Sequence, residues 1–421
     1  MKINEKYING NYALLGVTFK DNIKIVKLII DFANKNNIVL NINKKNENGD
    51  YSFLFAIYNN NNNNNNNNVE IVKLLIDYAV KNNITLKINE RDNHGDYPLL
   101  QATNKGNIGM VKLLIDYANK INIVLKINEP NNDGNYPLLS AIYKDNIKIV
   151  KLLIDYATEN NSFLRINAED SDGNYPLFLA INKDNVEIVK LLINYANKNI
   201  IILEINIKNK QQNYPLFFAI NEGYFKIAKL LIDYANKSNI NLNIYEQDND
   251  RYYLLLHSTI WNNVEIVKLL IGYPNENNIG LKINENDNKY GNYPFLWAIN
   301  KDNVEIVKLL IDYANKNNII LEINKKNKQQ NYSLFTAVYN KNIEIVKLLI
   351  DYANKKNIVL KINERDNHGD YPLLQATNKG NIEMVKLLID YANKNNIIIF
   401  DKDIGMSYEN FNISFLKSYY N

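Results

Sequence analysis

The pattern of apolar and polar residues repeats along almost the whole chain. Each repeat opens with a tyrosine followed by a short apolar segment, and the usual spacing between these tyrosines is 39 residues. A fixed period of this length is typical of stacked repeats, in which each unit contacts only its neighbours. We number ten repeats by their opening tyrosines, which are Tyr12, Tyr51, Tyr97, Tyr136, Tyr175, Tyr214, Tyr253, Tyr293, Tyr332 and Tyr371.

Each repeat predicts two helices. Residues 136–142 are almost wholly apolar and carry a proline at the first helical position, where the missing N–H group is not needed. Residues 186–196 are amphipathic, because Val186, Val189 and Ile193 share one face and polar side chains occupy the other. One repeat cannot bury both helices alone, whereas stacking gains ~1.5–3 kcal/mol for each buried aliphatic side chain. We therefore predict an all-α fold, a helical-repeat solenoid of stacked helix-turn-helix units.

Two insertions interrupt the period without changing its register. A run of ten asparagines, Asn59–Asn68, lengthens the second repeat between its two helices, and Lys289-Tyr290 adds one residue before the eighth. A polar, low-complexity run cannot bury apolar surface. We therefore predict that Asn59–Asn68 forms a flexible bulge.

The seventh repeat departs most from the pattern. Leu254 stands where other repeats have proline, Arg251 replaces the turn glycine, and Pro274 falls near the end of the second helix. Proline inside a helix removes a backbone hydrogen bond and costs ~3 kcal/mol or more. We predict an interruption of the array near residues 250–275 and an early end to this helix.

The two ends of the array differ in sequence. The array spans residues 1–396, and residues 397–421 abandon the repeat and form a cap or tail, with apolar residues at 397–400, Tyr408, Phe411, Phe415 and Leu416. At the other end, residues 2–5 align with residues 87–90, and the first helix is as apolar as internal ones. Terminal repeats need a polar outer side. We therefore expect a bare apolar patch that binds a partner or a second copy, unless the gene product extends upstream. Its residues are Leu14, Leu15, Val17 and Phe19.

Composition narrows the function classes. At 421 residues the chain exceeds the ~250–300 residues at which single cores stop growing. Its net charge of only +4 implies no strong attraction to nucleic acid or to an anionic membrane. The absence of cysteine excludes disulfides, thiolate nucleophiles and Cys-ligated metal sites. No apolar run approaches the ~20 residues of a membrane span, and the N-terminus has no apolar leader, so we expect a cytoplasmic or nuclear protein.

The repeat resembles the ankyrin repeat family. That family's unit has a turn of the form Asp-x-x-Gly-x-Thr-Pro-Leu-His, and residues 170–178 read Asp-Ser-Asp-Gly-Asn-Tyr-Pro-Leu-Phe. Residues 187–192 read Glu-Ile-Val-Lys-Leu-Leu, as in the family's outer helix, and Ile166-Asn167 stands where the family has Val-Asn. The likeness covers roughly residues 2–396. It implies a short inner helix, a longer outer helix and a concave face lined by the inner helices and turns.

Three departures from the family pattern carry structural predictions. Thr becomes Tyr, and His becomes Leu or Phe, as at Leu100, Leu139 and Phe217, so we expect apolar filling to replace a polar tie. The unit is about six residues longer than the family's ~33. The extra residues follow Ala196, where a glycine stop would stand, so we expect the outer helix to continue by another turn or so.

The residues that close each inner helix vary from repeat to repeat while the core positions do not. By the family resemblance these residues line the concave face. Aromatic side chains make good interface anchors because they bury much area at little entropic cost. Trp297 lies inside its helix, so both a core role and a contact role stay open. The predicted partner-binding residues are Phe19, Tyr58, Tyr143, Lys144, Trp261, Trp297 and Tyr339.

Other candidate chemistry is weak. A column of lysines recurs in the outer helices, but most repeats place a glutamate three residues before it, as Glu70 precedes Lys73, and an aspartate four after, so we interpret the column as a self-neutralised solvent face. His94 and His368 occupy the same turn position, but two ligands do not make a zinc site. No nucleophile elbow, phosphate loop or paired-carboxylate pocket occurs in the sequence. We expect no enzyme activity, no cofactor and no metal.

Two functions remain in play. One is a protein-protein interaction scaffold that binds an unidentified partner through the concave inner-helix and turn surface. The other is a self-associating or purely structural array without a dedicated ligand. Residues 86–120 and 360–394 differ only at Gly109 against Glu383, which indicates copying within the array. Recent copying gives the second function some support.

Overall fold

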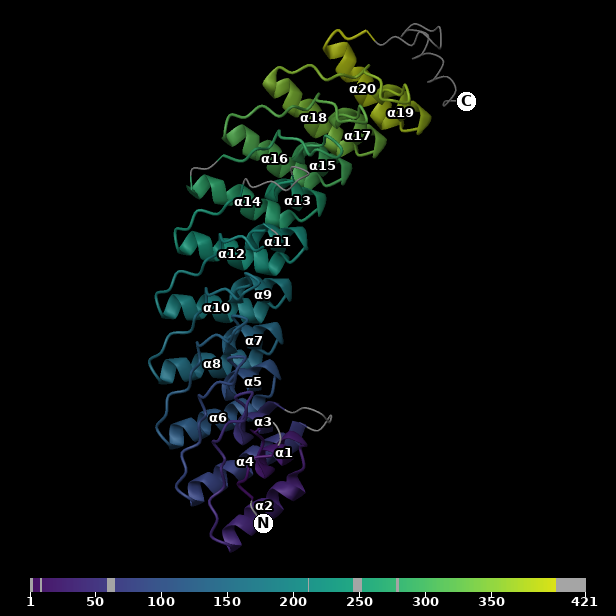
Figure 1. Ribbon diagram of the computed structural model, residues 1–421. Helices are drawn as coiled ribbons and strands as arrows, with labels where there is room; N and C mark the ends of the chain where they lie inside the picture. Colours follow the sequence, from purple (N-terminus) through teal and green to yellow (C-terminus); the bar gives the residue numbers. More distant parts are fainter. Residues whose placement is uncertain are drawn as a thin grey trace. The chain divides into compact units, whose positions relative to one another are not determined.

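The computed structural model (Figure 1) describes residues 3–7, 10–58, 65–210, 212–244, 252–277 and 280–398. Twenty α-helices and no strands occur in these ranges. The inner helices are α1 (Ala13–Phe19), α3 (Ser52–Tyr58), α5 (Pro98–Asn104), α7 (Pro137–Tyr143), α9 (Pro176–Asn182), α11 (Pro215–Asn221), α13 (Leu254–Ile260), α15 (Pro294–Asn300), α17 (Ser333–Tyr339) and α19 (Pro372–Asn378). The outer helices are α2 (Ile23–Lys35), α4 (Asn65–Lys81), α6 (Ile108–Lys120), α8 (Ile147–Glu159), α10 (Val186–Lys198), α12 (Phe225–Lys237), α14 (Val264–Asn277), α16 (Val304–Lys316), α18 (Ile343–Lys356) and α20 (Ile382–Lys394).

The chain divides into two compact units, Met1–Phe218 and Ala219–Asn421. Within each unit the short inner helices form one layer and the longer outer helices form a second layer beside it (Figure 1). Within each unit, neighbouring inner helices pack on one another, as α5 does on α3 and α7, and neighbouring outer helices do the same, as α6 does on α4 and α8. The core of each unit therefore lies between and within the two layers. This arrangement confirms the predicted all-α repeat solenoid.

Asparagine sets both ends of the outer helices. At the start, the Asn107 side chain accepts a hydrogen bond from the Met110 N–H group at 3.0 Å, which satisfies one of the helix's unpaired donors. The same cap recurs at Asn22, Asn146, Asn185, Asn303, Asn342 and Asn381. After the helix, a left-handed residue turns the chain, and it is usually asparagine, as at Asn122. The outer helix α10 ends at Lys198, two residues beyond Ala196, so the helix does continue past the family's stop, by about half a turn.

In most repeats the opening tyrosine is both a core residue and a polar tie, as at Tyr51, Tyr97, Tyr136, Tyr175, Tyr253, Tyr293 and Tyr332. The Tyr136 ring is buried, and its hydroxyl donates to the backbone carbonyls of Arg165 and Ala168, both at 2.8 Å. Those carbonyls belong to the segment that follows the outer helix and leads into the next repeat. A buried hydroxyl requires a hydrogen-bond partner. The expectation that apolar filling replaces the family's polar tie is therefore wrong at the tyrosine, although Leu100, Leu139 and Phe217 are buried as predicted.

A second tyrosine column and an asparagine column join neighbouring repeats. The hydroxyl of Tyr156 in α8 accepts a hydrogen bond from the Leu125 N–H group of the preceding repeat at 2.8 Å. The Asn89 carboxamide donates to the Val124 carbonyl at 2.8 Å and accepts from the Lys126 N–H group at 3.0 Å. Both patterns recur in each unit, for example at Tyr195, Tyr313, Asn128 and Asn324. Within each unit, these repeat interfaces are therefore closed by hydrogen bonds as well as by apolar packing.

The seventh repeat is not shortened. Its outer helix α14 runs to Asn277 and is as long as α12 of the sixth repeat, so the prediction that Pro274 ends this helix early is wrong. Pro274 comes late in the helix, where it removes a single intrahelical hydrogen bond. The helix is held before that point, because the Tyr273 hydroxyl bonds both the Leu242 N–H group and the Ile240 carbonyl. Arg251 lies outside the described residues.

The structure describes only part of the asparagine run. Helix α4 begins at Asn65, so the last four residues of the run are helical, and the prediction of a bulge over all of Asn59–Asn68 is wrong for that part. Adding residues to an existing helix is far easier than starting one, which explains this extension. Residues 59–64 lie outside the described residues. So do residues 399–421, which contain most of the predicted C-terminal cap.

The first repeat exposes only part of the predicted apolar surface. Leu14 and Leu15 of α1 are buried, because α1 packs against both α2 and α3, so the predicted bare side of α1 is wrong for these residues. Phe19 at the end of α1 is 42% exposed, as predicted, and further exposed apolar side chains lie on α2, where Ile25 is 42% and Leu28 is 66% exposed. The counterpart of Ile25 in α10, Ile188, is completely buried. The predicted patch on α1 is therefore confined to Phe19 and the half-buried Val17, and self-association through it stays a prediction.

Candidate functional site

The fourth residue of each inner helix determines how much space the helix leaves beside its turns. Across the ten repeats this position holds Gly16, Phe55, Gln101, Ser140, Leu179, Phe218, His257, Trp297, Thr336 and Gln375. Long side chains here reach back to the turn that precedes their own helix. Gln101 Nε2 donates to Asp96 Oδ2 at 2.6 Å, and Trp297 Nε1 donates to Asp287 Oδ2 at 3.1 Å. Ser140 and Thr336 have side chains too short for this contact, and each lines a cavity.

The first cavity, which we call the first pocket, lies in the N-terminal unit beside Ser140. Its volume is about 550 Å³, and it is lined by Asn104, Asp133, Asn135, Ser140, Tyr143, Lys144, Asp170, Ser171 and Asp172. Helix α7 supplies the hydroxyl and the tyrosine, and the turns before α7 and α9 supply the aspartates. The Asp170 carboxylate holds its own turn, because Oδ1 accepts from the N–H groups of Asp172 and Asn174, both at 2.8 Å.

A second cavity, the second pocket, lies in the C-terminal unit beside Thr336. Its volume is about 490 Å³, and it is lined by Asn300, Gln329, Asn331, Phe335, Thr336, Tyr339, Asn340, Asp366, Asn367 and His368. A smaller cavity of about 270 Å³ adjoins it, shares Asn300, Gln329, Asn331 and Thr336, and adds the rings of Tyr290 and Trp297. The two rings meet edge to face with their centroids 5.8 Å apart. The C-terminal unit therefore presents an aromatic and carboxamide-rich surface.

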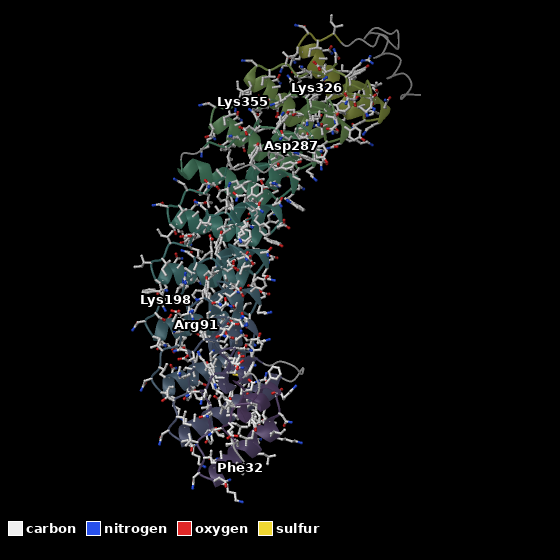
Figure 2. The ribbon with its side chains drawn as sticks, viewed as in Figure 1. Phe32, Arg91, Lys198, Asp287, Lys326 and Lys355 are labelled. Atoms are coloured by element: carbon white, nitrogen blue, oxygen red, sulfur yellow. The ribbon has the colours of Figure 1, made fainter. Side chains whose placement is uncertain are left out.

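Asp287 fixes the position of Trp297 in this surface. Asp287, labelled in Figure 2, is buried in the turn before α15 and accepts hydrogen bonds from the backbone N–H groups of Gly291 and Asn292, both at 3.1 Å. It also accepts the indole N–H of Trp297. Trp297 is half-buried and lines the adjoining cavity. Part of the Trp297 ring is therefore packed and part is accessible, which is compatible with both the core role and the contact role.

Four of the seven predicted contact residues line cavities in the structure. Tyr143 and Lys144 line the first pocket, Tyr339 lines the second, and Trp297 lines the adjoining cavity. The other three, Phe19, Tyr58 and Trp261, are exposed at inner-helix ends but line none of these cavities. Phe19 packs edge to face on Phe55 with ring centroids 5.3 Å apart.

Each exposed tyrosine at an inner-helix end attracts a lysine of the next repeat. The Lys105 ammonium lies 5.2 Å from the Tyr58 ring centroid, Lys183 lies 5.5 Å from Tyr143, and Lys379 lies 3.7 Å from Tyr339. The electron-rich face of an aromatic ring attracts cations. These positions of the inner face therefore favour positive charge even in the free protein.

Burial affects the carboxylates of the turns. It raises the pKa of Asp96 above its ordinary value, and hydrogen bonds from Asn131 and Gln101 oppose this shift only in part. Burial likewise raises the pKa of Asp50 in the turn before α3. These carboxylates organise the turns, and among the described residues no group of three or more His, Asp or Glu side chains is arranged to hold a metal ion.

The outer face is neutralised between repeats rather than within them. Lys308 pairs with Glu344 of the following repeat at 2.7 Å, and Lys347 pairs in the same way with Glu383 at 3.1 Å. Within-helix pairing of the predicted kind occurs at Lys268 and Glu265, at 3.4 Å. The sequence interpretation of a neutralised face holds, but the main partners differ. Exposed pairs of this kind add little stability.

One surface feature was not predicted from the sequence. The segment after most outer helices carries one exposed apolar side chain at the same repeat position, and these form an outer stripe of Val39, Val124, Phe163 and Ile202 in the N-terminal unit and Ile320, Val359 and Ile398 in the C-terminal unit. In the other three repeats this position holds Thr85, Asn241 or Gly280. The alternation of exposed Val124 with buried Leu125 was the signal available in the sequence.

No helix of the described part of the chain is long and apolar enough to cross a membrane.

Comparison with known proteins places these features in a family. The family model for ankyrin repeats in three copies matches residues 63–163, 160–244, 198–286, 236–320, 256–359 and 318–398. None of the curated proteins matches the sequence. Among solved structures, the ankyrin repeat protein EF0377 is 23% identical, with 51% of this chain and 97% of that chain covered and a TM-score of 0.39. An ankyrin repeat domain from Acinetobacter baumannii AYE is 20% identical, with 52% and 98% covered and a TM-score of 0.40.

Ankyrin repeats are generally protein-protein interaction modules, and the family is typically non-enzymatic. The family model covers well over half of the chain, and its matches include both pockets. The chain belongs to the ankyrin repeat family.

Proposed function

We propose that this protein is a recognition scaffold that binds a partner protein through its inner face, the surface formed by the ends of the inner helices and the turns beside them. The observation that carries this proposal is the contrast between constant and variable positions. The buried residues keep the same type from repeat to repeat, whereas the inner-helix ends change and place exposed aromatic rings beside cavities. Tyr143 is 55% and Tyr339 is 54% exposed.

The inner face suits a protein partner better than the outer face does. Exposed tyrosines and a tryptophan supply large contact areas with few rotatable bonds, and carboxamides at Asn300, Gln329 and Asn331 supply hydrogen bonds for a polar rim. The outer helices carry charges that are already paired with one another. The outer stripe is apolar but offers at most one side chain per repeat.

A comparative capture experiment tests the proposal. The tagged full chain, the inner-face variant Tyr143→Ala/Tyr339→Ala and the outer-stripe variant Val124→Ala/Val359→Ala are used to capture proteins from cells that express the protein. Each substituted side chain is at least half exposed, so all three chains should fold alike by circular dichroism. Truncating an anchor residue costs about 2 kcal/mol or more of binding free energy. We therefore expect the inner-face variant to capture one protein at least about tenfold less than the unchanged chain does.

The outer-stripe variant should retain that protein. Loss of the captured protein by the outer-stripe variant alone would contradict the inner-face proposal. Capture of nothing except further copies of this chain would favour the alternative of a self-associating array.

A further inference from the structure

The two pockets are the same site in two repeats. Every lining residue of the first pocket has a counterpart in the second at a constant offset of 196 in residue number, as Ser140 and Thr336 do, except that Phe335 lines only the second. The first pocket lies wholly in the N-terminal unit and the second wholly in the C-terminal unit. Five positions keep their chemical type, namely Asn104 and Asn300, Asn135 and Asn331, Ser140 and Thr336, Tyr143 and Tyr339, and Asp170 and Asp366.

A single local cause produces both cavities. Ser140 and Thr336 are the small hydroxyl residues of the inner-helix column, and a tyrosine follows each of them one helical turn later. The column neighbours of Ser140 are Gln101 and Leu179, and those of Thr336 are Trp297 and Gln375. A small residue at this position leaves space beside the turns, and turn residues such as Asp170 and Asp366 form part of each lining. The recurrence of this combination in each unit gives the chain two matched cavities.

Ser140 marks the first pocket as a place for a hydrogen-bonding ligand. This residue is only 3% exposed, and its Oγ atom has no hydrogen-bond partner in the structure. A buried hydroxyl without a partner is unfavourable. A ligand group in the pocket it lines would supply that partner.

The shared lining favours a ligand rich in hydrogen-bond donors. Each pocket contains a carboxylate, two carboxamide oxygens, a hydroxyl and a phenol ring. The first pocket adds Asp133 and Asp172 against one lysine, and the second has no lysine or arginine in its lining. Each lining thus holds more carboxylates than cationic side chains, while Lys210 pairs with Asp172 at 3.7 Å and Lys183 and Lys379 lie on the two tyrosine rings.

A guanidinium group matches this combination best. It is planar, permanently charged, carries five N–H donors for acceptors that surround it, and stacks on aromatic rings. An ammonium group presents three donors at a single point and would leave more of the separate acceptors unused. The cavities exceed the volume of one side chain, so neighbouring backbone of the partner also has room.

We infer that the chain carries two equivalent arginine-accepting pockets, one in each unit, and that its partner presents an arginine to each. The inference rests on the proposed function and specifies the partner's chemistry. A partner with two such arginines would be held at both pockets, and the second contact would form within the complex rather than from free solution.

The test uses the full chain and short peptides as probes. The probe is acetyl-Gly-Gly-Arg-Gly-Gly-amide, and matched peptides carry lysine, citrulline or leucine in place of arginine. Citrulline keeps the shape of arginine without its charge. Binding is followed by NMR of backbone amides in Ser140–Tyr143 and Thr336–Tyr339. We expect both sets to shift with the arginine peptide, at two peptides per chain, with at least about fivefold weaker binding of the citrulline peptide.

Single substitutions that fill one pocket provide internal controls. Ser140→Leu should abolish the shifts in α7 and leave those in α17, and Thr336→Leu should do the reverse, with one peptide bound per chain in each case. Leucine stands at this column position in α9, so the inner helix tolerates it. The intact response of the other pocket shows that the variant is folded.

The inference is overturned if neither pocket responds to the arginine peptide, if the citrulline peptide binds as tightly, or if a filled pocket still responds. These results are separable from failure of the proposed function. Loss of the captured partner by the Tyr143→Ala/Tyr339→Ala chain, together with no response to arginine peptides, would reject the arginine assignment and keep the inner-face proposal.

Discussion

Raising the pH above about 10 should unfold this protein steeply. Burial raises the pKa of the opening tyrosines well above the ordinary value of 10.0, at Tyr51, Tyr97, Tyr136 and Tyr175 in the N-terminal unit and at Tyr253, Tyr293 and Tyr332 in the C-terminal unit. In the unfolded chain the same phenols lose their protons near pH 10. Above that pH the unfolded state releases protons that the folded state keeps, so the free energy of unfolding falls as pH rises.

The expected size of this effect is large. Each such tyrosine lowers the free energy of unfolding by about 1.4 kcal/mol per pH unit above pH 10. Four of them together lower it by about 5–6 kcal/mol per pH unit for the N-terminal unit, against the ~5–15 kcal/mol of total stability that is usual for a domain. The midpoint of urea unfolding should be nearly constant from pH 7 to 9 and collapse between about pH 10 and 11.

Tyrosinate absorbance measured alongside the urea transitions identifies the cause. The phenols of the seven buried opening tyrosines should become ionised only as the helical signal is lost. The Tyr97→Phe variant carries one ionising group fewer and should show a shallower decline above pH 10. A urea midpoint that stays constant through pH 11 would show that the buried hydroxyls do not control alkaline stability.

The second large effect is expected at Tyr136, where the ring and the hydroxyl can be separated. Tyr136→Phe keeps the buried ring but leaves the carbonyls of Arg165 and Ala168 without their donor, which should cost about 1–3 kcal/mol. Tyr136→Ala also opens a cavity, because the ring is only 1% exposed, and should cost about 3–5 kcal/mol. Urea unfolding at pH 7 measures both values.

Tyr143 provides a matched control seven residues away. Its ring is more than half exposed, so Tyr143→Phe should change the free energy of unfolding by no more than about 0.5 kcal/mol. Equal losses for Tyr136→Phe and Tyr136→Ala would mean that the hydroxyl tie dominates and the ring packing contributes little. No loss for either variant would contradict the role assigned to the opening tyrosines.

Most of the fold follows from local patterns in the sequence. The 39-residue period, the apolar inner helices and the amphipathic outer helices depend on short-range chemistry that is visible in residues such as Pro137 and Val189. The register of ten repeats needs only their recurrence. The predictions that were wrong depended on contacts with residues that are distant in the sequence. Pro274 lies in a helix held by the Tyr273 hydroxyl, and Leu14 and Leu15 are covered because α1 packs on α2 and α3.

The candidate site was only partly visible in the sequence. Aromatic residues that close inner helices, such as Tyr143 and Tyr339, stood out because they vary against a constant core. The cavities beside them did not, because they arise from the absence of bulk at Ser140 and Thr336 between larger neighbours in space. The hydroxyl ties of the tyrosines were missed for a similar reason. Their acceptors are backbone carbonyls, which no sequence pattern displays.

Site-specific photo-cross-linking tests the inner-face proposal most directly. A benzoylphenylalanine is placed in the full chain at Tyr143 or Tyr339 on the inner face, or at Val124 or Val359 in the outer stripe, all of which are more than half exposed. After irradiation in cells that express the protein, the proposal predicts one shared cross-linked protein from Tyr143 and Tyr339 and none from Val124 or Val359. Cross-links to another protein from the outer stripe alone would contradict the proposal, as would cross-links from the inner face only to further copies of this chain.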